Sequence, residues 1–182
     1  MSFPIQKLIF TIVASICANS AMAQQAVQTL EPGIGYSRLK KWAIDSNLVF
    51  ENYTKDAIVV RDNGINFIPN IKVFAHFCAG DDYAGKANNI IIQENFSQSS
   101  GEGAKEALIK ERQYIELLAG APEDEKFKGN YNIRPEKKDA TSRAPGISIQ
   151  GESEKGKWEV GVFLYESYTQ LQTIRNKDAI CN

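Results

Sequence analysis

Residues 99–118 read SSGEGAKEALIKERQYIELL, and this stretch decides the fold class. Ser99 and Glu102 have the spacing of a capping box, in which two side chains bond free backbone N–H groups at a helix start. Gly120 follows where a helix end is expected. The pattern predicts an amphipathic helix over about residues 104–118, packed on one face of a sheet. The predicted apolar stripe consists of Ala104, Leu108, Ile115 and Leu118.

Runs of β-forming residues precede this helix. Residues 57–61 are followed by Asn63-Gly64, and Asn-Gly is a strong hairpin signal. Residues 71–77 place Ile71, Val73, Ala75 and Phe77 on one face, as expected for a strand with one buried side. Residues 89–94 are apolar on both faces at their centre, which places this strand inside the sheet.

The chain after the helix is also rich in β signals. Residues 147–150 and 158–165 alternate in polarity, and residues 153–156 between them have the composition of a hairpin loop. Residues 168–174 fit a strand or a helix, and their mixed period does not decide between the two. A helix between groups of hairpin-linked strands predicts an α+β fold with a mostly antiparallel sheet.

Three further segments complete the predicted domain. Residues 37–45 predict a short helix, with Leu39 and Trp42 on one side. Residues 24–35 show no clear periodicity and predict an extended lead-in. Residues 123–146 are charged and turn-rich and predict a surface loop, which either is disordered or plainly solvated, or binds a partner.

The first 23 residues have the pattern of a secretory signal peptide. Lys7 supplies the early positive charge, residues 8–18 are an apolar run, and Ala21-Met22-Ala23 supplies the small-residue pattern before a cleavage site. The run is too short to span a bilayer, which takes roughly 20 helical residues, so no membrane insertion is expected. We therefore predict a signal peptide over residues 1–23 and a single exported domain over residues 24–182, periplasmic or secreted.

The cysteines agree with export. Cys17 lies in the apolar run, and removal of that run leaves Cys78 and Cys181. An even pair in an oxidising compartment predicts a disulfide, which would hold the C-terminus against the middle of the chain.

The charge balance excludes one class of partner. The chain has 21 basic and 22 acidic side chains, for a net charge of −1. A general nucleic-acid-binding protein would show a basic excess, so no nucleic-acid partner is expected.

The densest set of reactive side chains lies around the single histidine. His76 is followed by Asp81 and Asp82, and imidazole with carboxylates suits zinc-like ions. Turn chemistry explains the Gly-Asp-Asp sequence more simply, so no metal and no cofactor are predicted. No Gly-x-Ser-x-Gly motif of a serine hydrolase is present, and Cys78 is assigned to the disulfide.

Aromatic side chains provide the candidate binding residues. Tyrosine near arginine is typical of binding hot spots. The expected function is therefore non-catalytic binding of a protein partner, of the inhibitor or immunity type. A secreted hydrolase that uses His76 with Asp81 or Asp82 stays open as an alternative, as does a carrier for a small apolar ligand. The candidate binding residues are Tyr131, Phe163, Tyr165, Tyr168 and Arg175.

Overall fold

The fold is known from a computed structural model of the chain. It describes residues 22–63, 69–78, 85–97, 101–119, 130–134, 145–153 and 155–181, with only the backbone at residues 130–134, 178 and 179.

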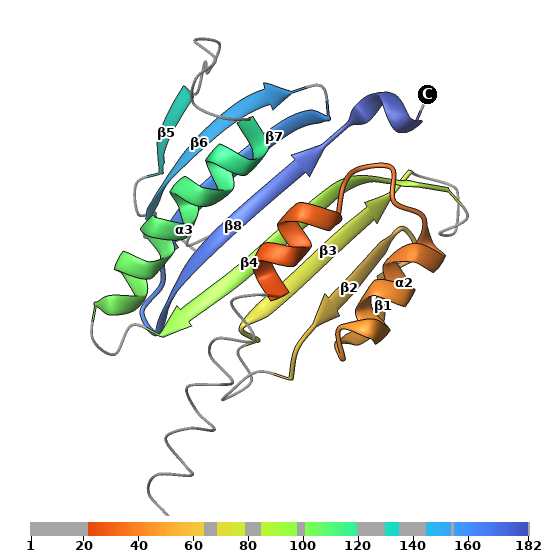
Figure 1. The fold of residues 1–182 in the computed structure, drawn as a ribbon, viewed down its shortest axis with the longest axis horizontal. Helices are drawn as coiled ribbons and strands as arrows, with labels where there is room; N and C mark the ends of the chain where they lie inside the picture. Colours follow the sequence, from red (N-terminus) through yellow and green to blue (C-terminus); the bar gives the residue numbers. More distant parts are fainter. Residues whose placement is uncertain are drawn as a thin grey trace, which may run out of the picture.

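Eight antiparallel strands form one sheet in the order β1-β2-β3-β4-β8-β7-β6-β5 (Figure 1). The first four strands are β1 (Val49–Thr54), β2 (Ala57–Arg61), β3 (Ile71–Phe77) and β4 (Ala87–Ser97). The last four are β5 (Asn130–Arg134), β6 (Gly146–Ser153), β7 (Gly156–Leu164) and β8 (Tyr168–Asn176). The helices are α2 (Tyr36–Asp45), α3 (Glu102–Ala119), a helical segment over residues 22–29 and the short η1 (Asp178–Cys181).

The two halves of the chain repeat one order of elements. In each half, helical structure is followed by four consecutive antiparallel strands, and the two fourth strands, β4 and β8, pair with each other. Their register runs from Asn89 opposite Asn176 to Ser97 opposite Tyr168. This central pairing joins the halves into one continuous sheet, with β1 and β5 at its edges.

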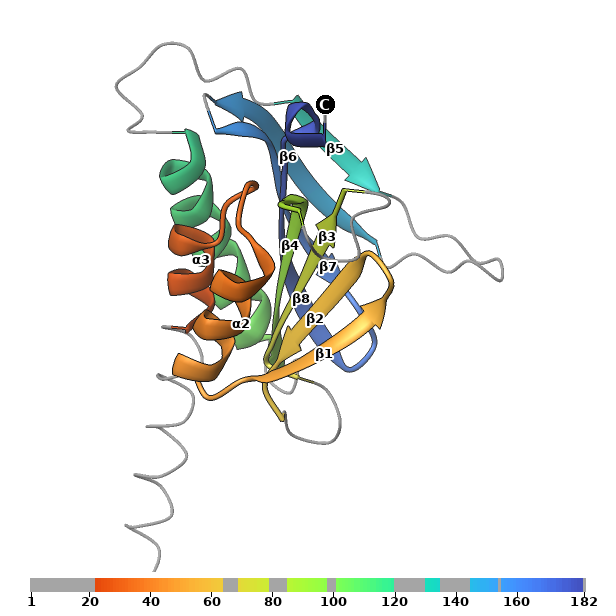
Figure 2. The same ribbon diagram turned by 90° about the vertical axis from the view of Figure 1, so that its right-hand side faces the viewer.

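The helical segment, α2 and α3 all lie on one side of the sheet (Figure 2). The side chains between the two layers form the main hydrophobic core, which includes Val60, Val73, Ile92 and Leu171. The predicted α+β fold, antiparallel sheet and covering helix are therefore confirmed. The predicted short helix is α2, and residues 168–174 belong to a strand.

The buried face of α3 differs from the predicted stripe. Its buried residues are Gly103, Ala107, Lys110 and Tyr114, whereas Leu108 is 50% exposed. Gly103 allows a close approach, because a Cβ atom there would collide with the backbone of Ser97 at the end of β4. Because the charged Lys110 lies on the inner face of α3, the apolar pattern alone predicts a stripe through Leu108 instead.

The prediction of an extended lead-in over residues 24–35 is wrong. Residues 22–29 are helical, and the segment buries Ala23, Ala26, Val27 and Leu30. These residues have the i, i+3, i+4, i+7 spacing of a helix face. Residues 24–35 alone do not show this period, because the predicted cleavage site falls inside the helical segment at Ala23.

Two other predictions concern the connections. Residues 130–134, inside the predicted loop over residues 123–146, form the edge strand β5. Gly64 of the predicted Asn63-Gly64 hairpin and the predicted capping residue Ser99 lie outside the described residues.

The predicted disulfide is confirmed. Cys78, just after β3, is bonded to Cys181 in η1, with the two Cα atoms 5.4 Å apart. None of the helices in the described part of the chain is long and apolar enough to cross a membrane.

Candidate binding surface

The face of the sheet opposite the helices carries an apolar row that runs across four neighbouring strands. Val59 pairs with Phe74, Phe74 with Ile91, and Ile91 with Ile174. Side chains alternate along each strand, and the neighbours of these residues point into the helix-covered core, so all four lie on the helix-free face. We call Val59, Phe74, Ile91 and Ile174 the cross-strand row. Val59 is only 4% exposed, whereas the other three are partly exposed. It spans roughly 14 Å at about 4.8 Å per strand.

Polar residues border the cross-strand row on one side. The neighbouring register places Arg61 opposite Lys72, Lys72 opposite Gln93, and Gln93 opposite Gln172. The Gln93 amide donates to the Gln172 amide oxygen at 3.1 Å, and Arg61 forms an ion pair with Glu51 at 3.0 Å. These side chains are therefore held in place by their own contacts.

Aromatic contacts organise the row around Phe74. The Tyr53 ring meets the Phe74 ring edge-on at a centroid distance of 5.8 Å, and Tyr53 is 65% exposed. The Lys72 ammonium lies 4.5 Å from the centre of the Phe74 ring. An apolar centre with aromatic side chains and a polar rim is the usual anatomy of a protein–protein interface.

Part of the predicted site lies on this same face. Tyr165 and Tyr168 flank the turn between β7 and β8, and their rings stack at 4.5 Å with an interplanar angle of 14°. Burial raises the pKa of the Tyr168 hydroxyl, and Tyr165 adds to this rise. Phe163, on β7, is only 4% exposed. Residue 131 lies in β5, and its side chain is outside the described part of the structure.

Arg175 is not brought together with these aromatic residues. It lies seven positions from Tyr168 on β8, a separation of roughly 23 Å along the strand, and it faces the helix layer. Arg175 is only 4% exposed, and its guanidinium donates to the backbone carbonyls of Val27 at 3.1 Å and Leu30 at 2.9 Å. Arg175 thus fastens the helical segment to the sheet.

His76 also lies on the helix-free face, where it pairs with Ala57 and Asn89 and is partly exposed. The Thr54 hydroxyl, which donates to Asp56 at 2.6 Å, lowers the pKa of the Asp56 carboxyl, and the nearby charge of His76 contributes. Asp81 and Asp82 lie outside the described residues. Within the described ranges, no three metal-ligating side chains form a cluster.

A buried charged cluster, which the sequence pattern did not predict, lies between α3 and β4. The Lys110 ammonium forms an ion pair with the Glu94 carboxylate, and the Tyr114 hydroxyl donates to the same carboxylate at 2.9 Å. Burial raises the pKa of Glu94, while Lys110 opposes this rise. Ala107, Lys110 and Tyr114 have the spacing of one helix face, and this spacing was the sequence signal for the buried side of α3. The cluster holds α3 on the sheet.

Neither a protein-family model nor a curated protein matches this chain.

Proposed function

We propose that this protein is an exported binding protein that recognises a protein partner through the helix-free face of its sheet. The observation that carries the proposal is the cross-strand row, an apolar strip centred on Phe74 and bordered by ordered polar side chains. The core residues of the sheet pack under the helices on the opposite face, so the helix-free face is the one that a partner can reach (Figure 2). The signal-peptide pattern and the Cys78–Cys181 disulfide support a periplasmic or secreted location.

The sheet supplies a rigid base for such an interface. Phe74 lies on β3, which is paired on both sides, so its backbone cannot shift without disturbing two strand pairings. A preorganised surface lowers the entropy lost on binding. The exposed Tyr53 ring and the Lys72 stem extend the contact area around Phe74, and the stacked Tyr165–Tyr168 pair lies at the end of the same face.

The test compares two variants that place the same charge on opposite sides of the molecule. Phe74→Asp changes the cross-strand row, whereas Ile109→Asp changes an apolar residue of α3 that is 62% exposed on the helix side. The tagged protein and both variants are used to capture partners from an envelope extract of the source organism. Circular dichroism confirms that each variant is folded.

We expect the unmodified protein and Ile109→Asp to capture the same stoichiometric protein, and Phe74→Asp to bind it at least about tenfold more weakly, as for a hot-spot residue. Capture of no stoichiometric partner by the folded protein would contradict the proposal. Equal capture by both variants would also overturn it.

A further inference from the structure

Two tyrosine rings lie face to face at the turn between β7 and β8. The rings of Tyr165 and Tyr168 have centroids 4.5 Å apart and planes inclined by 14°. The Tyr165 N–H donates to the Tyr168 carbonyl at 2.9 Å, and this hydrogen bond closes the turn and holds the two residues together. Both tyrosines are partly exposed, and Glu166 and Ser167 between them are exposed, so an oxidant can approach the turn from solvent.

The stacked arrangement suits a reaction between the two rings. Loss of one electron and the phenolic proton turns a tyrosine side chain into a phenoxyl radical, whose unpaired electron lies partly on the two ring carbons ortho to the oxygen. The orbitals that hold this electron are perpendicular to the ring plane. Two rings that stack face to face can therefore overlap at these carbons, whereas an edge-on pair cannot.

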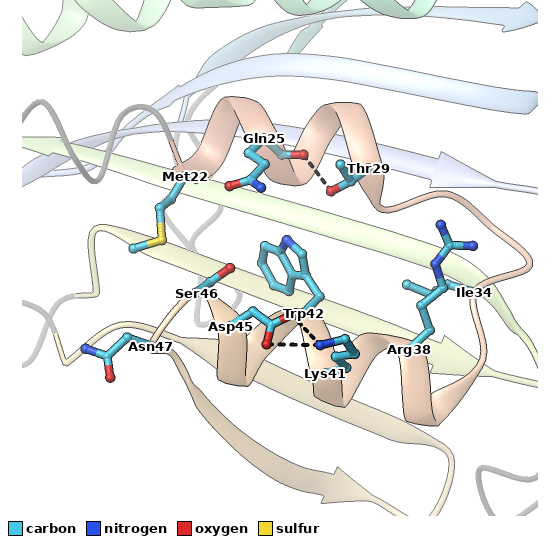
Figure 3. A pocket seen from close by; sticks show the side chains of 10 residues that line it. All are labelled: Met22, Gln25, Thr29, Ile34, Arg38, Lys41, Trp42, Asp45, Ser46 and Asn47. Atoms are coloured by element: carbon cyan, nitrogen blue, oxygen red, sulfur yellow. Dashed lines mark hydrogen bonds and ion pairs between the residues drawn. The ribbon is translucent and has the colours of Figure 1, made fainter.

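Two other aromatic pairs and a tryptophan show a different arrangement. Tyr36 meets Phe50 edge-on, at an interplanar angle of 87°, and Tyr53 meets Phe74 at 78°. Phenylalanine has no phenolic proton to lose, so neither pair can couple in this way. Trp42 is the one aromatic side chain among the described residues that line the groove between the helical segment and α2 (Figure 3), so that groove supplies no second ring.

We propose that Tyr165 and Tyr168 form an oxidative cross-linking site, at which a peroxidase-type oxidant joins the two rings by a carbon–carbon bond. The oxidant removes one electron and one proton from each phenol, and the two radicals couple between their ortho carbons. The hydrogen on each coupled carbon then moves as a proton to the ring oxygen, which restores both phenols. The electrons and protons removed from the protein reduce one hydrogen peroxide to two water molecules. The product fixes the β7–β8 turn covalently, whatever partner the sheet binds.

Peptide mass spectrometry after oxidation tests this site. The full protein, in the form in which the cell accumulates it, is treated with hydrogen peroxide and a haem peroxidase. Cleavage after lysine and arginine releases residues 158–175, which contain Tyr165 and Tyr168 and none of the other tyrosines. Tyr165→Phe removes one ring of the pair, and Tyr53→Phe is the control, because Tyr53 is 65% exposed but does not belong to the pair. A synthetic peptide of residues 158–175 shows how the same sequence reacts without the sheet, and circular dichroism confirms that both variants are folded.

We expect the peptide from the oxidised protein to lose two hydrogen atoms and to show dityrosine fluorescence, while the protein stays a monomer on a denaturing gel. Tyr53→Phe should give the same yield, Tyr165→Phe should lose the product completely, and the synthetic peptide should give a lower yield. The proposal is overturned if the peptide from the protein only gains oxygen, if the product persists in Tyr165→Phe, or if the cross-links join separate molecules. A yield from the synthetic peptide equal to that from the folded protein would also overturn it.

Discussion

The Arg175 guanidinium donates a 2.9 Å hydrogen bond to the carbonyl oxygen of Leu30, although 145 positions of sequence separate the two residues. The same guanidinium bonds the Val27 carbonyl, so one buried side chain of β8 satisfies two acceptors at the end of the helical segment. Helix ends leave carbonyls without intrahelical partners, and arginine is well suited to bond several acceptors at once. β8, the last strand in the sequence, therefore holds the helical segment over residues 22–29 in place.

Replacement of Arg175 by methionine should destabilise the protein and loosen the helical segment. Methionine keeps much of the side-chain volume but leaves buried carbonyls unpaired, at a cost of about 1–3 kcal/mol for each. Urea unfolding measures the loss, and hydrogen exchange should show faster exchange in residues 26–30. Arg112→Met is the control, since the side chain of Arg112 is 84% exposed. Equal stability of the two variants would contradict this account.

The parts of the fold that could be predicted are those set by local patterns. The alternation of residues 71–77 predicted β3, and the cysteine count predicted the Cys78–Cys181 bond. The inner face of α3 could not be predicted in this way, because Lys110 is buried only through its pairing with Glu94 on another element.

The candidate surface depends even more on distant parts of the chain. Phe74 becomes the centre of an apolar row only when β4 pairs with β8 and brings Ile174 beside Ile91. That pairing joins the two halves of the chain, and no short-range signal defines its register. A one-residue shift would move Ile174 to the other face of the sheet.

Removal of the Lys110 cation from the buried cluster should strongly destabilise the protein. Lys110→Met leaves the Glu94 carboxylate buried without its counter-charge, and we expect a loss of about 3–5 kcal/mol in the free energy of unfolding at pH 7. The double variant Glu94→Gln with Lys110→Met should regain much of this loss, because an amide carries no charge and still accepts from Tyr114. Lys105→Met, on the exposed side of α3, is the control. A double variant as unstable as Lys110→Met would refute the electrostatic explanation.

Loss of the disulfide should lower stability without changing the fold. The bond closes a separation of 103 residues, for which the chain-entropy model gives up to about 4–5 kcal/mol. The double variant Cys78→Ser with Cys181→Ser should unfold at lower urea concentration, with an unchanged far-ultraviolet circular dichroism spectrum. The unreduced protein should give a peptide that joins Cys78 to Cys181 by mass spectrometry, and two free thiols would exclude the bond.

Stability should fall between mildly acidic and mildly basic pH because of a half-buried carboxyl on α3. Burial raises the pKa of Glu111 from 4.5 to about 7. Between these two pKa values the folded protein keeps a proton that the unfolded chain has released. Where the folded state binds more protons than the unfolded state, the free energy of unfolding falls as the pH rises. Glu111→Gln cannot ionise, and its stability relative to the unmodified protein should therefore be higher at pH 8 than at pH 5. Urea unfolding at both values, with the exposed Glu106→Gln as control, measures the difference. A difference that is equal at both pH values would show that Glu111 ionises normally in the folded protein.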